Sequence, residues 1–166
     1  QKGGYAHFMR KEIDEQPHAL EATLSPRLTG ESIDFSADGV EDAFLSDFRS
    51  IQIVACGTAM HAGLIGKHLI EFLARIPVSV HIASEYRYSN PIVGRDDLVI
   101  IVSQSGETAD TLAALRLAKA RGARTLAIVN VVGSSIAREA ERVLYTYAGP
   151  EIAVASTKAF SVQMAM

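Results

Sequence analysis

Residues 103–108 hold three hydroxyls and one side-chain amide within six positions, on Ser103, Ser105, Thr108 and Gln104. Each of these groups can donate a hydrogen bond to an anion. Gly106, which lies among them, lets the backbone approach a ligand closely because it has no side chain. These residue types in this pattern favour binding of a phosphate group without help from lysine or arginine.

Two expected elements would present the backbone of this stretch to the same ligand. Residues 98–102 form an apolar, β-branched run, which predicts a strand buried on both faces of a parallel sheet. From Glu107 onward apolar residues recur at helical spacing, and Gly122 would end that helix. The first N–H groups of a helix lack intrahelical partners and suit an anion. A simpler interpretation remains open, in which Ser105 or Thr108 only caps the helix.

Strand and helix patterns alternate along most of the chain. Five apolar runs predict strands at residues 51–55, 78–82, 98–102, 125–129 and 143–147. The pattern between the first two predicts a helix over residues 60–75, with a buried stripe of Leu64, Leu69, Phe72 and Leu73. This alternation indicates an α/β fold with a doubly wound, five-stranded parallel sheet of the flavodoxin-like type. Ligands of such folds bind outside the carboxyl ends of the strands.

Two further loops are expected at the same rim of the sheet. Strand 51–55 ends in Cys56, Gly57 and Thr58, and the last strand leads to the small and hydroxyl-bearing residues 154–158. Such loops are often rich in glycine, serine and threonine for turns and caps alone. Together with residues 103–108 they nevertheless favour a phosphorylated polyol as the ligand.

Composition excludes several classes of protein. The 166 residues carry a net charge of −3 and no block of like charge, so we expect no nucleic-acid partner. No apolar run approaches membrane-spanning length, so we expect no membrane partner and a cytoplasmic location. The single cysteine, Cys56, excludes an internal disulfide, and His61 and His68 lack a third ligand, so we expect no metal. Neither the dinucleotide nor the Walker phosphate motif occurs, and no cofactor is expected.

The two ends of the chain differ from its middle. Residues 1–40 are expected to be a linker tail with short helices at 5–15 and 18–24, and an approach helix is expected within 32–47. Residues 156–166 carry a helical pattern that lacks any stop signal. We therefore expect the chain to be a piece of a longer protein, with residues 41–166 as its folded domain.

The turn at 103–108 resembles the Ser-x-Ser-Gly-x-Thr phosphosugar-binding loop of the sugar isomerase (SIS) family. Four stretches narrow the resemblance to the isomerase half of the glutamine-dependent fructose-6-phosphate aminotransferase family: residues 5–17, 55–58, 103–111 and 151–160. Members of that family join a glutaminase domain to two SIS subdomains, and make glucosamine 6-phosphate and glutamate from fructose 6-phosphate and glutamine. The resemblance implies that residues 41–166 are the first SIS subdomain.

The resemblance also assigns roles to individual residues. It implies phosphate binding by Ser103, Gln104, Ser105 and Thr108, and a sugar site lined by Thr58, Val154 and Ser156. Where the family usually has a serine after Cys-Gly-Thr, this chain has Ala59, so the phosphate contact at that position would come from the backbone N–H. The ligand would be fructose 6-phosphate or glucosamine 6-phosphate. The family's catalytic Glu, His and Lys belong to the second subdomain, so we expect no catalytic residue here.

Three functions remain open from the sequence. The first is the phosphosugar-binding half of the aminotransferase, with a glutaminase domain, a second SIS subdomain and a second copy of the chain as partners. The second is a sugar-phosphate sensor, in which SIS modules bind without catalysis. The third is a dimerisation domain that has lost its ligand, which Ala59 makes conceivable.

Overall fold

A computed structural model describes residues 2–166, and Gln1, the first residue of the expected linker tail, lies outside the described residues. The central sheet has five strands: β3 (Ser50–Ala55), β4 (Val78–Ile82), β5 (Asp97–Ser103), β6 (Arg124–Val129) and β7 (Arg142–Tyr145). All neighbouring strands run parallel, in the order β4-β3-β5-β6-β7. The chain order therefore reverses between β3 and β5, where flavodoxin-like folds bind ligands. The sequence-based prediction of a doubly wound parallel sheet is confirmed.

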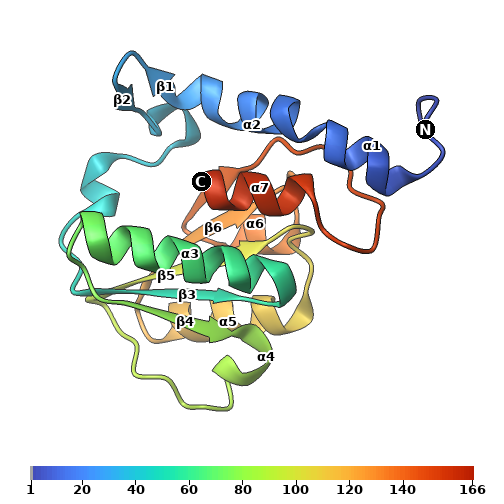
Figure 1. The fold of residues 1–166 in the computed structure, drawn as a ribbon. Coiled ribbons are helices and arrows are strands. Elements are labelled where there is room, and N and C mark those ends of the chain that lie inside the picture. The colour runs from blue at the N-terminus through green and yellow to red at the C-terminus, as the bar shows by residue number, and fades with distance from the viewer. Residues whose placement is uncertain (1) are drawn as a thin grey trace.

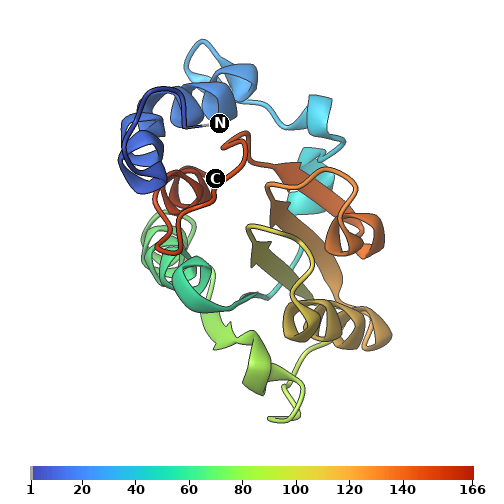
Figure 2. The same cartoon turned by 90° about the vertical axis from the view of Figure 1, so that its right-hand side faces the viewer.

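Helices cover both faces of the sheet. Helices α3 (Gly57–Leu73) and α7 (Lys158–Ala165) pack on one face, while α5 (Ala109–Ala120) and α6 (Ser135–Glu139) pack on the other (Figure 2). The short helix α4 (Ala83–Tyr86) follows β4. Right-handed crossovers between parallel strands place successive helices in this way.

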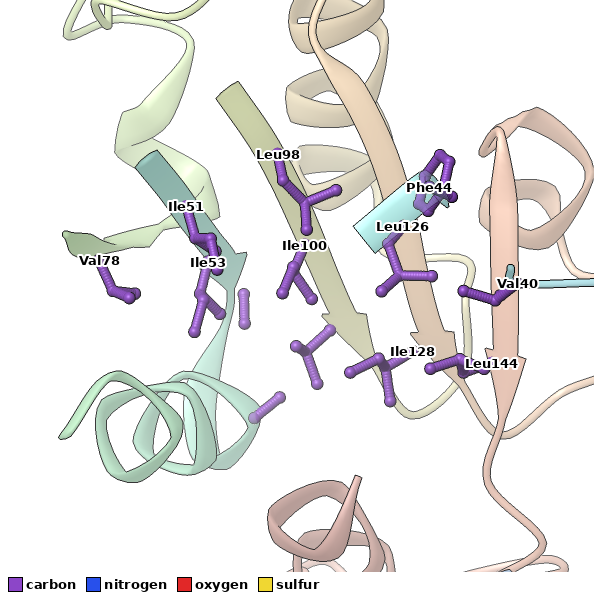
Figure 3. Packing of buried hydrophobic residues seen from close by; sticks show 13 residues of the cluster. Val40, Phe44, Ile51, Ile53, Val78, Leu98, Ile100, Leu126, Ile128 and Leu144 are labelled. Carbon is purple, nitrogen blue, oxygen red and sulfur yellow. The ribbon is translucent and has the colours of Figure 1, made fainter. Parts of the chain in front are cut away.

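Alternate residues of each strand enter two separate cores. Ile53, Ile100 and Ile128 lie on the face toward α3 and α7 (Figure 3). Their sequence neighbours Val54 and Ile101 point the other way and pack with α5. Every residue of β5 is buried, which explains why its sequence shows an unbroken apolar run rather than alternation.

The prediction for the buried face of α3 is wrong. The expected stripe lies at the surface, where the side chain of Phe72 is 75% exposed and that of Leu73 is 74% exposed. The residues buried against the sheet are small: Ala59, Ala62 and Gly63. A Cβ added to Gly63 would lie 2.8 Å from Cγ2 of Ile53, so the helix approaches the sheet too closely for larger side chains.

The expected stripe also includes Leu64 and Leu69, which are 41% and 51% exposed. The large apolar side chains of α3 therefore form an outer surface of the described chain rather than its core. Helical periodicity identified the helix correctly but could not tell which of its faces meets the sheet.

The N-terminal segment packs on the domain. Helices α1 (Phe8–Asp14) and α2 (Gln16–Leu24) lie across α7 (Figure 1). The chain then forms the 3₁₀ turn η1 (Ser25–Arg27) and a small antiparallel pair, β1 (Leu28–Thr29) and β2 (Ser32–Ile33). Two more 3₁₀ turns, η2 (Ser36–Asp38) and η3 (Asp42–Leu45), replace the single helix expected within residues 32–47. Gly39, at a φ of 73°, separates them.

A buried arginine fixes this segment to the edge of the sheet. Arg27 is 3% exposed, and its guanidinium donates to the carbonyl oxygen of Tyr145 in β7 (2.8 Å) and to that of Thr23 (2.7 Å). It also forms an ion pair with Asp38 at 2.7 Å. One side chain thereby joins α2, η2 and β7.

Candidate functional site

Two helix N-termini meet where the strand order reverses. Helix α3 begins at Gly57, after β3, and α5 begins at Ala109, after β5 and the turn 103–108. Because β3 and β5 are neighbours, the first turns of both helices line a single cavity of about 190 Å³ at this rim. Each helix N-terminus carries unpaired N–H groups and the positive end of the helix dipole. The cavity is therefore suited to an anion.

Seven of the eight residues predicted for the site line this cavity: Thr58, Ala59, Ser103, Gln104, Ser105, Thr108 and Ser156. The eighth, Val154, does not line it, and its side chain is 107% exposed, as in an open chain. The structure thus brings three separate loops together at one rim. Ligand binding by these residues stays a prediction.

The two serines of the turn each use one lone pair within the turn. Ser103 Oγ accepts a hydrogen bond from the backbone N–H of Gly106 (3.0 Å), and Ser105 Oγ accepts one from that of Glu107 (3.2 Å). A hydroxyl that accepts a bond still has its proton to donate. Both serines can therefore donate to a bound anion while their oxygens hold the turn in shape.

The simpler interpretation of helix capping does not account for these hydroxyls. Thr108 is the N-cap residue of α5, but its side chain makes no capping hydrogen bond. The bond that Ser105 accepts comes from Glu107, which precedes the helix. The Thr108 hydroxyl has no other hydrogen-bond partner within residues 2–166, so it is available to a ligand.

The neighbouring β6–α6 loop braces the turn. The carbonyl oxygen of Gly106 accepts from the N–H of Ile136 (3.0 Å), and that of Gln104 accepts from the N–H of Asn130 (3.2 Å). The Glu107 carboxylate accepts the N–H of Ser135 at 2.7 Å. Hydrogen bonds from the side chain and backbone of Ser135 hold the pKa of Glu107 below its usual value. Glu107 is therefore engaged with α6.

The opposite wall of the cavity offers a different kind of group. The Ser156 hydroxyl donates to the Glu151 carboxylate, with 3.0 Å between Oγ and Oε2. An ionised carboxylate only accepts, so the proton of Ser156 is used there and its lone pairs remain. Ser156 therefore suits a donor such as a sugar hydroxyl, whereas the serine turn suits an acceptor such as phosphate.

Four other residues complete the lining: Cys56, Val102, Thr111 and Gln163. Thr111 Oγ1 lies 4.0 Å from Cys56 Sγ, within the limit for a weak hydrogen bond to sulfur. Sequence reasoning missed Thr111, although its spacing of three residues from Thr108 places both on one helix face. It also missed Gln163, whose signal is a single polar residue on the buried side of α7.

No lysine or arginine lines the cavity. Lys158, the nearest candidate in the sequence, is 4% exposed at its side chain and forms an ion pair with Glu15 at 2.7 Å. His61 and His68 are exposed on α3. Within residues 2–166, no group of three or more potential metal-binding side chains comes together, and no helix is long and apolar enough to cross a bilayer.

Known proteins with a similar sequence share this arrangement of motifs over the whole described chain. The chain is 59% identical over 165 residues to a glutamine–fructose-6-phosphate aminotransferase [isomerizing] of Clostridium tetani. It is 60% identical over 166 residues to the same enzyme of Symbiobacterium thermophilum. Each match covers 99% of this chain but only 27% of the relative, so the chain spans about a quarter of the relatives' length.

A solved structure and a family model agree with these relatives. The C-terminal domain of glucosamine-fructose-6-phosphate aminotransferase from Francisella tularensis superposes with a TM-score of 0.93 at 44% identity. That match covers 99% of this chain and 46% of the solved chain. The SIS domain model matches residues 44–166, which include the whole central sheet and the cavity. The chain therefore belongs to the SIS domain family.

Proposed function

We propose that this chain is the phosphosugar-binding part of the isomerase half of a glutamine–fructose-6-phosphate aminotransferase. Its ligand is fructose 6-phosphate or glucosamine 6-phosphate. A glutaminase domain and a second SIS subdomain are its partners within the longer enzyme, which is a cytoplasmic homodimer. The identity to named aminotransferases along the whole chain supports this assignment.

One observation carries the proposal: three hydroxyls with free protons stand beside two helix N-termini. Ser103, Ser105 and Thr108 all line the cavity, and the intraprotein bonds of the two serines leave their protons to donate. A phosphate monoester carries strong acceptor oxygens and about −1.5 to −2 charges at pH 7. Hydroxyl donors and helix N-termini together match both its hydrogen-bonding pattern and its charge.

The two walls of the cavity orient the ligand. The phosphate lies at the serine turn, and a sugar hydroxyl donates to Ser156 on the opposite wall. At about 190 Å³, the cavity is smaller than the roughly 300–1,000 Å³ of pockets for drug-sized ligands. It holds the phosphate and part of the sugar, and the remainder extends past the rim.

Binding alone is the expected activity of this chain. Transfer of a proton between two sugar carbons needs a positioned base and acid. The cavity lining contains no carboxylate, imidazole or amine. Turnover therefore depends on groups from outside the described residues.

Titration calorimetry tests the proposal directly. Fructose 6-phosphate and glucosamine 6-phosphate are expected to bind, while fructose without phosphate does not. The double variant S103A/S105A should lose this binding, and S32A, at the exposed β1–β2 hairpin, should keep it. Equal affinity for fructose and fructose 6-phosphate, or an unchanged double variant, would contradict the phosphate site. Isomerase turnover by the chain alone would contradict the binding-only role.

A further inference from the structure

The segment 151–157, which carries Ser156 into the cavity, has no helix or strand to hold it. Its shape depends instead on two carboxylates. Glu151 lies within it and accepts from the Thr157 N–H (2.9 Å), the Thr157 hydroxyl (3.1 Å) and the Ala159 N–H (3.1 Å). Glu151 thus caps α7 and also takes the proton of Ser156. This accounts for the end of the segment nearest α7.

The second carboxylate comes from far away in the sequence. Glu12 is the one buried residue of α1, with 1% of its surface exposed. Its Oε1 accepts from the N–H of Ile152 at 2.6 Å, and both its oxygens lie 3.2 Å from the N–H of Ala153. Within residues 2–166 Glu12 has no ion pair, so backbone amides compensate its charge. A buried carboxylate with this arrangement holds its partners firmly, because leaving it unpaired is costly.

Two further contacts join the same helices to the far end of the segment. Glu15 forms an ion pair with Lys158, the first residue of α7. The Ser161 hydroxyl, one turn later, donates to Gln16 Oε1 at 2.6 Å. The junction of α1 and α2 therefore grips α7 while Glu12 grips the segment in front of it. Each end of 151–157 is held by a group from the first 16 residues.

We propose that Glu12 is a positioning residue for the sugar side of the cavity. By fixing the backbone at Ile152 and Ala153, it sets where the chain reaches Ser156, three residues further on. The serine turn lies on the opposite wall, braced by the β6–α6 loop and without any contact to α1. Loss of Glu12 should therefore weaken recognition of the sugar and leave recognition of the phosphate unchanged. This inference rests on the proposed function of the same site.

The test compares two ligands on the same variants by NMR titration. Inorganic phosphate reports the serine turn alone, and fructose 6-phosphate reports both walls. In E12A the affinity for fructose 6-phosphate should fall about tenfold, the effect of losing about one hydrogen bond, while that for phosphate stays the same. E12Q keeps one acceptor oxygen and should show a smaller loss. E21Q, at an exposed position of α2, is the matched control and should match the unaltered chain.

A second measurement checks the contact itself without any ligand. Amide hydrogen exchange at Ile152 and Ala153 should be faster in E12A than in the unaltered chain, because both N–H groups lose their acceptor. Thermal unfolding of every variant shows whether the domain remains folded, and E12Q provides the comparison if E12A does not.

Each result has a distinct meaning. A selective loss of fructose 6-phosphate affinity together with faster exchange supports the positioning role. Unchanged affinity for fructose 6-phosphate, or an equal loss for both ligands, overturns it, since the second result means that Glu12 supports the whole fold. If the unaltered chain itself does not prefer fructose 6-phosphate to phosphate, the proposed function fails first, and the positioning role fails with it.

Discussion

Gly106 lies directly against Ser134, so closely that a Cβ added to Gly106 would stand 2.1 Å from Ser134 Oγ and 2.6 Å from Ser134 Cβ. The backbone of Gly106 is also in the left-handed region, at a φ of 68°. Ser134 Oγ is buried and lacks a hydrogen-bond partner within the described residues. Two independent constraints therefore require glycine at the centre of the turn.

Replacing Gly106 should show both constraints in the free energy of unfolding. G106A is expected to cost about 2–4 kcal/mol, from roughly 1–2 for the left-handed backbone and about 1–3 for the overpacking. G122A is the matched control, because Gly122 has a φ of 82° but open space around its Cα. It should show the backbone cost alone. Denaturant unfolding measures both, and equal losses in the two variants would contradict the role of Ser134.

A hydroxyl restored at position 59 should strengthen phosphosugar binding. Ala59 lies in the first turn of α3 and lines the cavity, so the side chain of A59S would reach the ligand. One added neutral hydrogen bond is expected to raise the affinity by about three- to tenfold. Ala62, one turn further along α3, does not line this cavity, and A62S should give no gain. Calorimetry with fructose 6-phosphate decides between these outcomes, and an unchanged A59S would place position 59 outside the site.

Tyr86 anchors β3 through a buried hydrogen-bond chain. Its hydroxyl donates to Gln52 Oε1, and Gln52 Nε2 donates to the carbonyl oxygen of Ile92, both at 2.7 Å. Y86F would leave the Gln52 oxygen unpaired and should cost about 1–3 kcal/mol at pH 7. Y88F, at a side chain that is 71% exposed, should change the free energy of unfolding by about 0.5 kcal/mol or less.

The same tyrosine should also make stability depend on alkaline pH. Burial, with a smaller contribution from the charge of Asp97, raises the pKa of Tyr86 to about 12 from a model value of 10.0. A group whose pKa is raised by folding stabilises the fold fully below its unfolded pKa and loses that contribution as the pH rises through its folded pKa. The stability advantage over Y86F should therefore fall from pH 10 toward pH 12. A constant difference over that range would contradict it.

Glu15 should produce a loss of stability in acid. Hydrogen bonds from Lys11 and Lys158 hold the pKa of Glu15 below its model value of 4.5. Its contribution is therefore present above about pH 4.5 and is lost as the pH falls through the lower folded value. E15Q should cost roughly 1–3 kcal/mol at pH 7, because the buried Lys158 ammonium loses its partner, and much less at pH 3. Urea unfolding across this range tests it, with E31Q at an exposed position as control.

The sheet could be predicted because its strands are written in local sequence. Buried parallel strands need apolar, β-branched residues on both faces, so each run was visible by itself, and the bounds of β4 agree at both ends. Most residues of the candidate site could also be predicted, because loops after neighbouring parallel strands must meet at one rim.

Other features could not be predicted because they depend on distances between elements. Phe72 and Leu73 share the periodicity of a buried stripe, yet Gly63 brings α3 too close to Ile53 for large side chains on that face. The contact between Glu12 and Ile152 joins residues 140 positions apart, and no local pattern marks either of them as a partner. Such pairings follow only from the tertiary arrangement.

A cavity lined only by neutral side chains has an electrical consequence under the proposed function. Two helix N-termini contribute about +0.5 elementary charge each, which makes the empty rim mildly electropositive. A sugar phosphate brings in about −1.5 to −2, and no lysine or arginine in the lining offsets the excess. Loading the ligand thus reverses the sign of the local potential. Cationic groups approaching this rim are repelled when the cavity is empty and attracted once it is filled.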